Sequence, residues 1–214
     1  QTCALPILYE VFVLFALMTA LLYLYYEGRY ATRRMGAFVM IVISAAVAFL
    51  LWYTFTRDAH EIQPLIPALQ SYWMKVHVPT NFIGYGAFAV SAMVGTAYLL
   101  ADRGILATRL PALRVLEDVM YKAIAIGFAF FTIATILGAL WAAEAWGTYW
   151  QWDPKETWAL IVWLNYATWL HMRLTKGLRG AVLAWWAVVG LLVTTFAFVG
   201  VNMFLTGLHS YGAL

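Results

Sequence analysis

The chain has 214 residues, of which 64% are hydrophobic and only 11% are charged. A soluble domain carries about 25% charged residues, so this chain cannot cover a water-facing surface, and its mean hydropathy of +0.79 indicates an integral membrane protein. The same composition excludes a disordered, collagen-like or disulfide-rich protein, and the single cysteine, Cys3, excludes an intrachain disulfide or a CxxC redox pair.

Six apolar segments follow one another along the chain, each near the ~20 residues with which a helix crosses a bilayer. They cover residues 8–26, 35–55, 80–101, 119–142, 157–172 and 180–204. The apolar runs are continuous rather than alternating, which favours helices over the strands of a closed barrel. We therefore predict an all-α fold, a polytopic integral membrane helix bundle of about six transmembrane helices that forms one domain over residues 1–214.

We infer that the first residues of the chain have a different origin from the rest. The chain opens on Gln1 rather than on methionine, and the stretch from Gln1 to Ile7 can be back-translated into a common sequencing-adapter sequence. We expect residues 1–7 not to be native and the gene to continue upstream. No basic region precedes the first apolar run, so a cleavable signal peptide is not predicted.

The basic residues predict the orientation of the bundle. Ten of the 13 lie in or beside alternate loops: Arg29, Arg33 and Arg34, then Arg103, Arg109, Arg114 and Lys122, then Arg173, Lys176 and Arg179. The positive-inside rule places these loops in the cytoplasm. Both termini and the loops at 56–79 and 143–156 are then outside. The net charge of +3 is therefore a sign of topology, and no nucleic-acid partner is expected.

The region 143–158 is the most unusual part of the sequence. Five tryptophans and one tyrosine fall within the 18 residues 141–158. One interpretation is an aromatic belt at the membrane interface. The other is a flat aromatic platform for a large planar ligand, favoured because the other outer loops contain few tryptophans. The same loop ends in Asp153-Pro154-Lys155-Glu156, which predicts a capped helix start, so Asp153 is either a cap or a residue of the site.

The four histidines are the second feature of the sequence that indicates a ligand site. His60, His77 and His209 are all expected outside, on the side of the Trp-rich loop, whereas His171 lies about 25 Å of helical rise from Pro154, near the inner end of its helix. Two imidazoles beside an aromatic platform suit bis-histidine ligation of haem iron, which predicts His77 and His209 as the ligands. A zinc site is less favoured, since it needs a third or fourth ligand. His60 stands in a polar run and is expected to be solvated.

The segment Trp146-Gly-Thr-Tyr-Trp150-Gln-Trp152-Asp153-Pro-Lys-Glu-Thr-Trp158 resembles the tryptophan-rich "WWD" signature of haem-handling membrane proteins, in the extended form of the CcsA (ResC) family. Three further segments resemble the histidine regions of that family. They are Pro67 to Val78 around His77, Tyr166 to Arg173 around His171, and Val201 to Gly212 around His209. Together they span residues 65–212.

The resemblance implies a membrane subunit of cytochrome c synthase, a haem lyase, with haem b as its substrate. Haem would enter at a transmembrane site that includes His171 and move to the outer site. There His77 and His209 would be axial ligands over a platform of Trp146, Trp150, Trp152 and Trp158. Asp153 is the candidate catalytic residue. The haem vinyl groups would then meet the two cysteines of an apocytochrome c CxxCH motif.

The family works with a CcsB-like membrane partner that supplies a second transmembrane histidine, and its members carry further upstream helices. The implied location is the bacterial inner membrane, or the thylakoid membrane in a plastid, with the active face outside. Two alternatives stay open at this point. One is a haem transporter or exporter of the CcmC type, which hands haem to a chaperone; the other is a structural membrane protein with an aromatic belt and no haem.

Overall fold

The computed structural model describes residues 5–57 and 67–209, and these residues form helices and loops with no strand. The helices in chain order are α1 (Leu5–Tyr30), α2 (Gly36–Arg57), the short 3-10 turn η1 (Pro67–Gln70), α3 (Tyr72–Asp102), α4 (Leu113–Trp146), α5 (Pro154–Thr175), α6 (Ala181–Thr195), the π-helical turn η2 (Phe196–Gly200) and α7 (Val201–Phe204). The last three follow without a break and form one rod. Each of the six predicted segments lies in one helix or in this rod, apart from the end residues Met35 and Gly180, so the all-α prediction is confirmed.

Five of the described helices are long and apolar enough to cross a membrane: α1, α2, α3, α4 and the rod from Ala181 to Phe204. α5 has 22 residues, which is sufficient length. It is less apolar because it carries Lys155 and Glu156 in its first turn and Asn165, His171 and Arg173 further along. The chain is a polytopic membrane helix bundle in which α5 is the most polar member.

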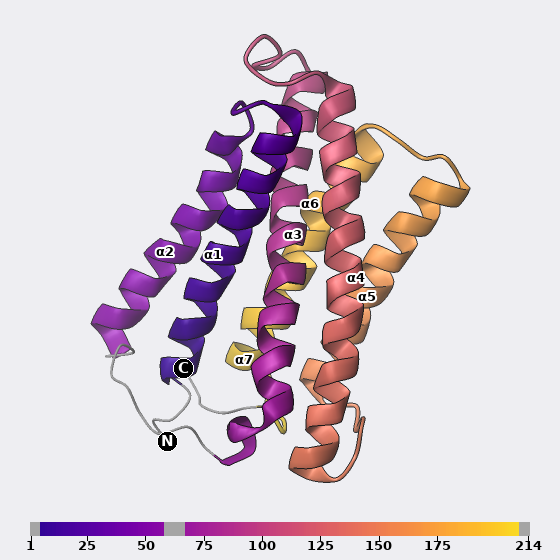
Figure 1. The fold of residues 1–214 in the computed structure, drawn as a ribbon. Coiled ribbons are helices and arrows are strands. Elements are labelled where there is room, and N and C mark those ends of the chain that lie inside the picture. The colour runs from indigo at the N-terminus through magenta and orange to yellow at the C-terminus, as the bar shows by residue number, and fades with distance from the viewer. Residues whose placement is uncertain (1–4, 58–66, 210–214) are drawn as a thin grey trace.

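The helices run up and down, and their loops gather at two ends (Figure 1). The loops 31–35, 103–112 and 176–180, in the basic regions of the sequence, lie at one end, which we call the basic end. The start of α1, the end of α2, the loop 147–153 and α7 lie at the other, the tryptophan-rich end. This grouping is the one predicted from the arginines and lysines; the membrane face that each end meets stays a prediction.

α3 is the central helix of the bundle and packs against α1, α2, α4 and α6. Small residues allow this, because they let backbones approach closely where no hydrophobic effect drives helices together in lipid. A Cβ atom added to Gly84 would stand 3.2 Å from the carbonyl oxygen of Gly127 on α4, and one added to Gly127 would stand 2.7 Å from the Phe88 ring. The two glycines therefore set the close contact of α3 with α4.

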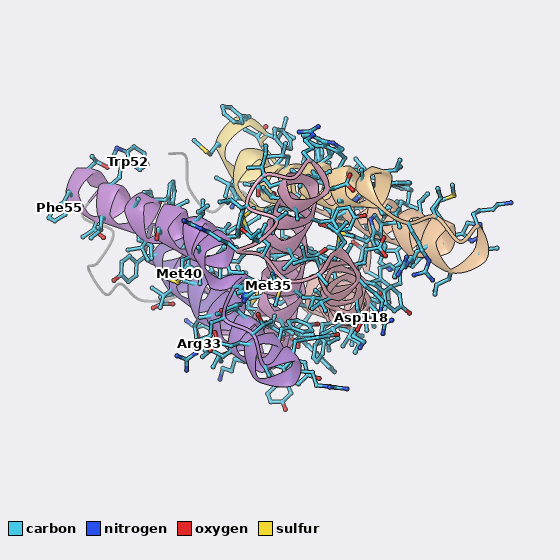
Figure 2. The ribbon with its side chains drawn as sticks, turned by 90° about the horizontal axis from the view of Figure 1, so that it is seen from above. Arg33, Met35, Met40, Trp52, Phe55 and Asp118 are labelled. Carbon is cyan, nitrogen blue, oxygen red and sulfur yellow. The ribbon has the colours of Figure 1, made fainter. Side chains whose placement is uncertain are left out.

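α1 and α2 form the side of the bundle that is least covered by other helices. Figure 2 shows Met40, Trp52 and Phe55 along α2 on its outer surface, and the Phe55 side chain is 82% exposed. Large apolar side chains on an uncovered helix face are the expected arrangement where lipid is the solvent. At the basic end α1 is joined to α4, since Tyr30 donates a hydrogen bond of 2.5 Å to Asp118.

Candidate functional site at the tryptophan-rich end

The loop between α4 and α5 is shorter than predicted. α4 continues through Trp146, and Asp153 is the N-cap of α5 as predicted, so the connection comprises only residues 147–153 of the Trp-rich region 143–158. α4 ends at Gly147, whose φ of 80° is left-handed and costs glycine little. The helix extends further than expected because alanines and tryptophans at 141–146 continue an apolar helical run up to the glycine.

Two buried carboxylates hold this loop together. Glu156 Oε2 accepts hydrogen bonds from the backbone N–H groups of Gln151 (2.7 Å) and Asp153 (3.2 Å). Asp153 Oδ2 in turn accepts from the backbone N–H of Lys155 (3.0 Å), which completes a capping box. The predicted capping role of Asp153 is therefore confirmed.

Trp152 is the exposed tip of the loop. Its φ is 59°, a left-handed conformation that is unfavourable for a bulky side chain. Its residue surface is 68% exposed, and its ring meets that of Trp150 edge to face at 5.7 Å. A strained backbone that displays a large ring to the surroundings is typical of a functional position.

The tryptophan rings do not lie in one plane. Trp146 meets Trp141 at 4.7 Å with an interplanar angle of 67°, and the angle between Trp150 and Trp152 is 90°. Trp158 lies one turn into α5, where its ring packs on Phe196 of η2 at 4.4 Å. The loop therefore presents ring edges as well as faces, which differs from the flat platform that the sequence predicts.

His209 lies just beyond α7 and is brought to the start of α5 by Asp153. Its Nδ1 is 2.8 Å from Asp153 Oδ2, and the backbone N–H of Leu208 donates to Asp153 Oδ1 at 2.6 Å. The His209 ring also contacts the rings of Trp146 (4.7 Å) and Trp141 (5.3 Å). A carboxylate only accepts hydrogen bonds, so His209 Nδ1 carries the proton, and in the neutral ring the lone pair is on Nε2.

His77 occupies the second turn of α3, because α3 begins at Tyr72, ahead of the predicted apolar segment 80–101. Its Nδ1 is 2.8 Å from the carbonyl oxygen of Ala134 on α4. A carbonyl is also an acceptor only, so the Nδ1 of His77 is protonated in this contact. The imidazole packs beside Gly138, where an added Cβ would stand 2.9 Å from the ring. It therefore lies against α4 and is half-buried.

The two histidines share one face of α4. Ala134 and Gly138 contact His77 and Trp141 contacts His209, at the i, i+4, i+7 spacing of one helix face. The three positions span about 10 Å of helical rise. In both imidazoles Nδ1 faces a protein acceptor, which fixes the orientation of the ring. Within the described ranges no three His, Cys, Asp or Glu side chains group as a metal-ion site.

The electrostatic surroundings of His209 favour the neutral ring. Burial lowers the pKa of His209 below its usual 6.5, and the hydrogen bond to Asp153 opposes part of that decrease. The His209 side chain is 20% exposed and that of Asp153 only 3%. The neutral imidazole, the form that binds metals, is therefore the form that this site stabilises.

His171 is far from this cluster. It lies in the last two turns of α5, at the opposite end of the helix from Asp153. Its side chain is exposed on the surface of α5 and has Thr175 Oγ1 at 3.4 Å from Nδ1. The structure thus joins His209, Trp146 and Asp153 in direct contact, places His77 against the same helix α4, and leaves His171 apart. His60 lies outside the described residues.

Sequence reasoning missed three residues of this region: Trp141, Glu156 as a loop-closing group, and Lys155. The Trp141 indole donates to the carbonyl oxygen of Ala68 at 2.7 Å, and Lys155 Nζ donates to two carbonyl oxygens of η2. A charged residue just inside a membrane helix is a usable sequence signal, but its partners lie more than 40 residues away. No local pattern indicates them.

The fold and this cluster define a polytopic membrane protein with two oriented imidazoles and a tryptophan-rich loop at one end of its bundle. A family model described as "Cytochrome C assembly protein" matches residues 5–209. The chain is 37% identical over 210 residues to the cytochrome c biogenesis protein CcsA of Chlamydomonas reinhardtii, which covers 96% of this chain and 60% of that protein.

It is 41% identical over 177 residues to CcsA of Parasynechococcus marenigrum (strain WH8102), covering 70% of this chain and 58% of that protein. It is 34% identical over 242 residues to CcsA of Chlorella vulgaris, covering 97% and 76%. The chain belongs to the CcsA family of cytochrome c assembly proteins. It spans about three fifths of the length of the first two relatives.

Proposed function

We propose that the chain is the membrane subunit of a cytochrome c synthase that receives haem b, presents it at the tryptophan-rich end and supports its attachment to apocytochrome c. The observation that carries the proposal is that His77 and His209 both contact one face of α4. Each has its Nδ1 engaged by a protein acceptor and its Nε2 available to an axial position of iron. Membership of a cytochrome c assembly family supports the same reading.

The tryptophans provide the apolar contact that a porphyrin needs. Trp146 packs on the His209 ring, so it borders the ligand position directly, and Trp150 and Trp152 extend the aromatic surface along the loop. Each large ring can bury roughly 150–250 Å². Trp158 supports the loop from within the bundle through Phe196. Haem retention then depends on several rings together.

Asp153 acts in this proposal through His209. Its side chain is almost fully buried behind the imidazole, where it fixes the ring orientation and the tautomer. Such a partner raises the basicity of a metal ligand, and its loss typically costs 10–100-fold in metal affinity. We therefore assign Asp153 as a positioning residue of the site.

The attachment step requires no cysteine of this chain, which has only one and no CxxCH motif. Each thiol of the apocytochrome motif adds across one haem vinyl group: sulfur bonds to one vinyl carbon and the proton goes to the other, so no net oxidation occurs. The thiolate is the stronger nucleophile, which requires both cysteines to be reduced. The chain contributes the fixed position of the haem.

His171 belongs in this proposal to a second site near the basic end. The His171 imidazole is exposed on a membrane helix. Because an ionisable side chain is costly in free energy within lipid, it is a candidate functional residue. We propose that a CcsB-like partner covers this face of α5 and supplies a second histidine. The tryptophan-rich end then faces the outside of the bacterial inner membrane, or the lumen of a thylakoid.

The test is a reconstitution of attachment. The chain is co-expressed with a CcsB-like partner and an apocytochrome carrying CxxCH, and covalent haem on the cytochrome is measured after denaturing electrophoresis. His77→Ala and His209→Ala should each lower attachment by at least about tenfold, and His60→Ala should leave it unchanged. If the chain binds haem but no haem becomes attached to the cytochrome under any condition, the result would favour a haem exporter and contradict the proposed synthase function.

A further inference from the structure

The rod that leads to His209 contains a π-helical turn, η2, between α6 and α7. A π-turn holds one more residue than an α-turn, so it rotates and shifts everything that follows it. One residue corresponds to about 100° of rotation and 1.5 Å of rise. The phase of α7, and hence the side from which the chain leaves toward His209, depends on whether this turn is π or α.

The π-turn is held from outside by Lys155. Its Nζ donates hydrogen bonds to the carbonyl oxygens of Phe198 (2.8 Å) and Ala197 (3.1 Å). A π-turn disturbs the regular i to i+4 pattern and frees carbonyls for such partners. Hydrogen bonds from a charged donor are about twice as strong as neutral ones. The ammonium therefore stabilises this turn in its π form.

Lys155 and Asp153 hold the same segment at two points. Both belong to the start of α5; Lys155 binds the carbonyls at 197 and 198, and Asp153 binds the Leu208 N–H and the His209 ring. The chain from η2 to His209 is thus fastened at its beginning and at its end to one helical turn. That turn directly follows the tryptophan-rich loop.

We propose that Lys155 is a positioning residue for His209: by stabilising the π form of η2 it sets the phase of α7 and delivers the imidazole to Asp153 and Trp146. The inference rests on the proposed function, in which His209 binds haem iron. Apolar packing of the same turn, through Trp158 on Phe196, does not depend on the charge. Loss of the ammonium should therefore change the placement of His209 more than the presence of the helix.

The test compares Lys155→Met, Lys155→Arg and the control Lys75→Met, a matched change of an exposed lysine at the same end of the bundle. The first measurement is hydrogen–deuterium exchange over residues 201–209 of the full chain without haem. Lys155→Met should raise exchange there about tenfold. Lys155→Arg, which keeps a charged donor, and Lys75→Met should match the unmodified chain.

The second measurement is the haem spectrum of the same proteins with and without added imidazole. Lys155→Met should lose the His209 ligand and regain a six-coordinate spectrum with imidazole, which a general loss of folding would not allow. Normal exchange in Lys155→Met would overturn the proposal, and so would raised exchange with His209 ligation intact.

If Lys155→Met does not reach the membrane, Lys155→Gln replaces it, because its amide keeps a neutral donor. Lys155→Gln should then show raised exchange and reduced His209 ligation, and values equal to the unmodified chain would overturn the proposal. His209→Ala separates the two claims. An unchanged haem spectrum in that variant would contradict the proposed function. The exchange measurement is made without haem, so it tests the action of Lys155 on this segment independently.

Discussion

Asp153 serves the backbone and an imidazole at the same time. One carboxylate caps α5, binds the Leu208 N–H and orients His209, all from a buried position. From the sequence, Asp153 is either a helix cap or a residue of the site. In the structure it caps α5 and also contacts His209. The cap could be predicted because Asp153, Pro154 and Glu156 are neighbours in sequence. The contact with His209 could not, because it joins residues 56 positions apart.

Replacing Asp153 by Asn should separate these roles. Asn caps a helix about as well as Asp, so α5 should stay folded and membrane levels should be normal. Oδ2 accepts from both the Lys155 N–H and the His209 ring, so an Asn oxygen in that place keeps both contacts. Its amide group then meets the Leu208 N–H donor to donor, and the negative charge behind the imidazole is lost. Haem affinity should fall about 10–100-fold, measured by titration of the purified chain.

Asp153→Ala should lose the same affinity and in addition about 1 kcal/mol of stability from the missing cap. Ser71→Ala is the control for a cap that does not touch His209, since Ser71 caps α3 and donates to Glu144. Full haem affinity in Asp153→Asn would show that the carboxylate serves only the helix.

The lowered pKa of His209 predicts how haem retention depends on pH. Because burial brings that pKa below 6.5, the neutral ring persists where an exposed histidine would already be protonated. Retention should be flat from about pH 8 down to about pH 6.5 and decline only at lower pH. The unfolded chain takes up its proton first, so folding stability should also start to fall below about pH 6.5. Half-loss of His209 ligation at pH 7 would contradict this.

At the scale of elements, the helices could be predicted and their roles could not. Apolar run lengths predict six helices because lipid requires every backbone polar group to be satisfied within the helix. The central place of α3 depends on where its glycines meet α4, and the π form of η2 depends on a lysine from α5. Both are contacts between distant segments. The position of the 147–153 loop is intermediate, since Gly147 and Asp153 mark its ends in the sequence.

Trp152 gives a test at the scale of the loop. Its left-handed backbone costs a non-glycine residue about 1–2 kcal/mol, and its exposed ring contributes little packing. Trp152→Gly should therefore unfold at the same temperature as the unmodified chain or higher, yet retain less haem. Trp152→Ala removes the ring and keeps the strain, so it should be the less stable of the two.

Trp146→Ala should behave in the opposite way for stability. It loses ring contacts with Trp141 and His209, which should destabilise the chain by about 2 kcal/mol. A Trp152→Gly variant as destabilised as Trp146→Ala would mean that the loop backbone is unstrained and the ring is a packing residue.

At the scale of the whole molecule, the arginines and lysines divide the bundle into two ends, and the two candidate sites fall one at each end. This division predicts the membrane topology. In a Cys3→Ser background, a cysteine at Thr148 should react with a membrane-impermeant thiol reagent added from outside, and one at Arg109 should react only after the membrane is opened. The reverse labelling pattern would mean that the two sites face the opposite sides of the membrane from those predicted.

Substitution of His171 should affect haem loading without affecting the haem site at the tryptophan-rich end. Its side chain is exposed, so His171→Ala should change stability by less than about 0.5 kcal/mol. Haem loading of the complex with its partner should fall, while the spectrum of haem already held at the tryptophan-rich end should not change. Full loading and normal cytochrome maturation would make His171 a residue without a haem role.

The central claim is that His77 and His209 ligate one haem, and the axial ligands can be read directly from the haem spectrum of the purified chain. The unmodified protein should give a six-coordinate, bis-histidine spectrum. His77→Ala and His209→Ala should each give a five-coordinate haem that added imidazole returns to six-coordinate, and the double variant should retain little haem. A bis-histidine spectrum that survives both single substitutions would show that His77 and His209 are not the ligands.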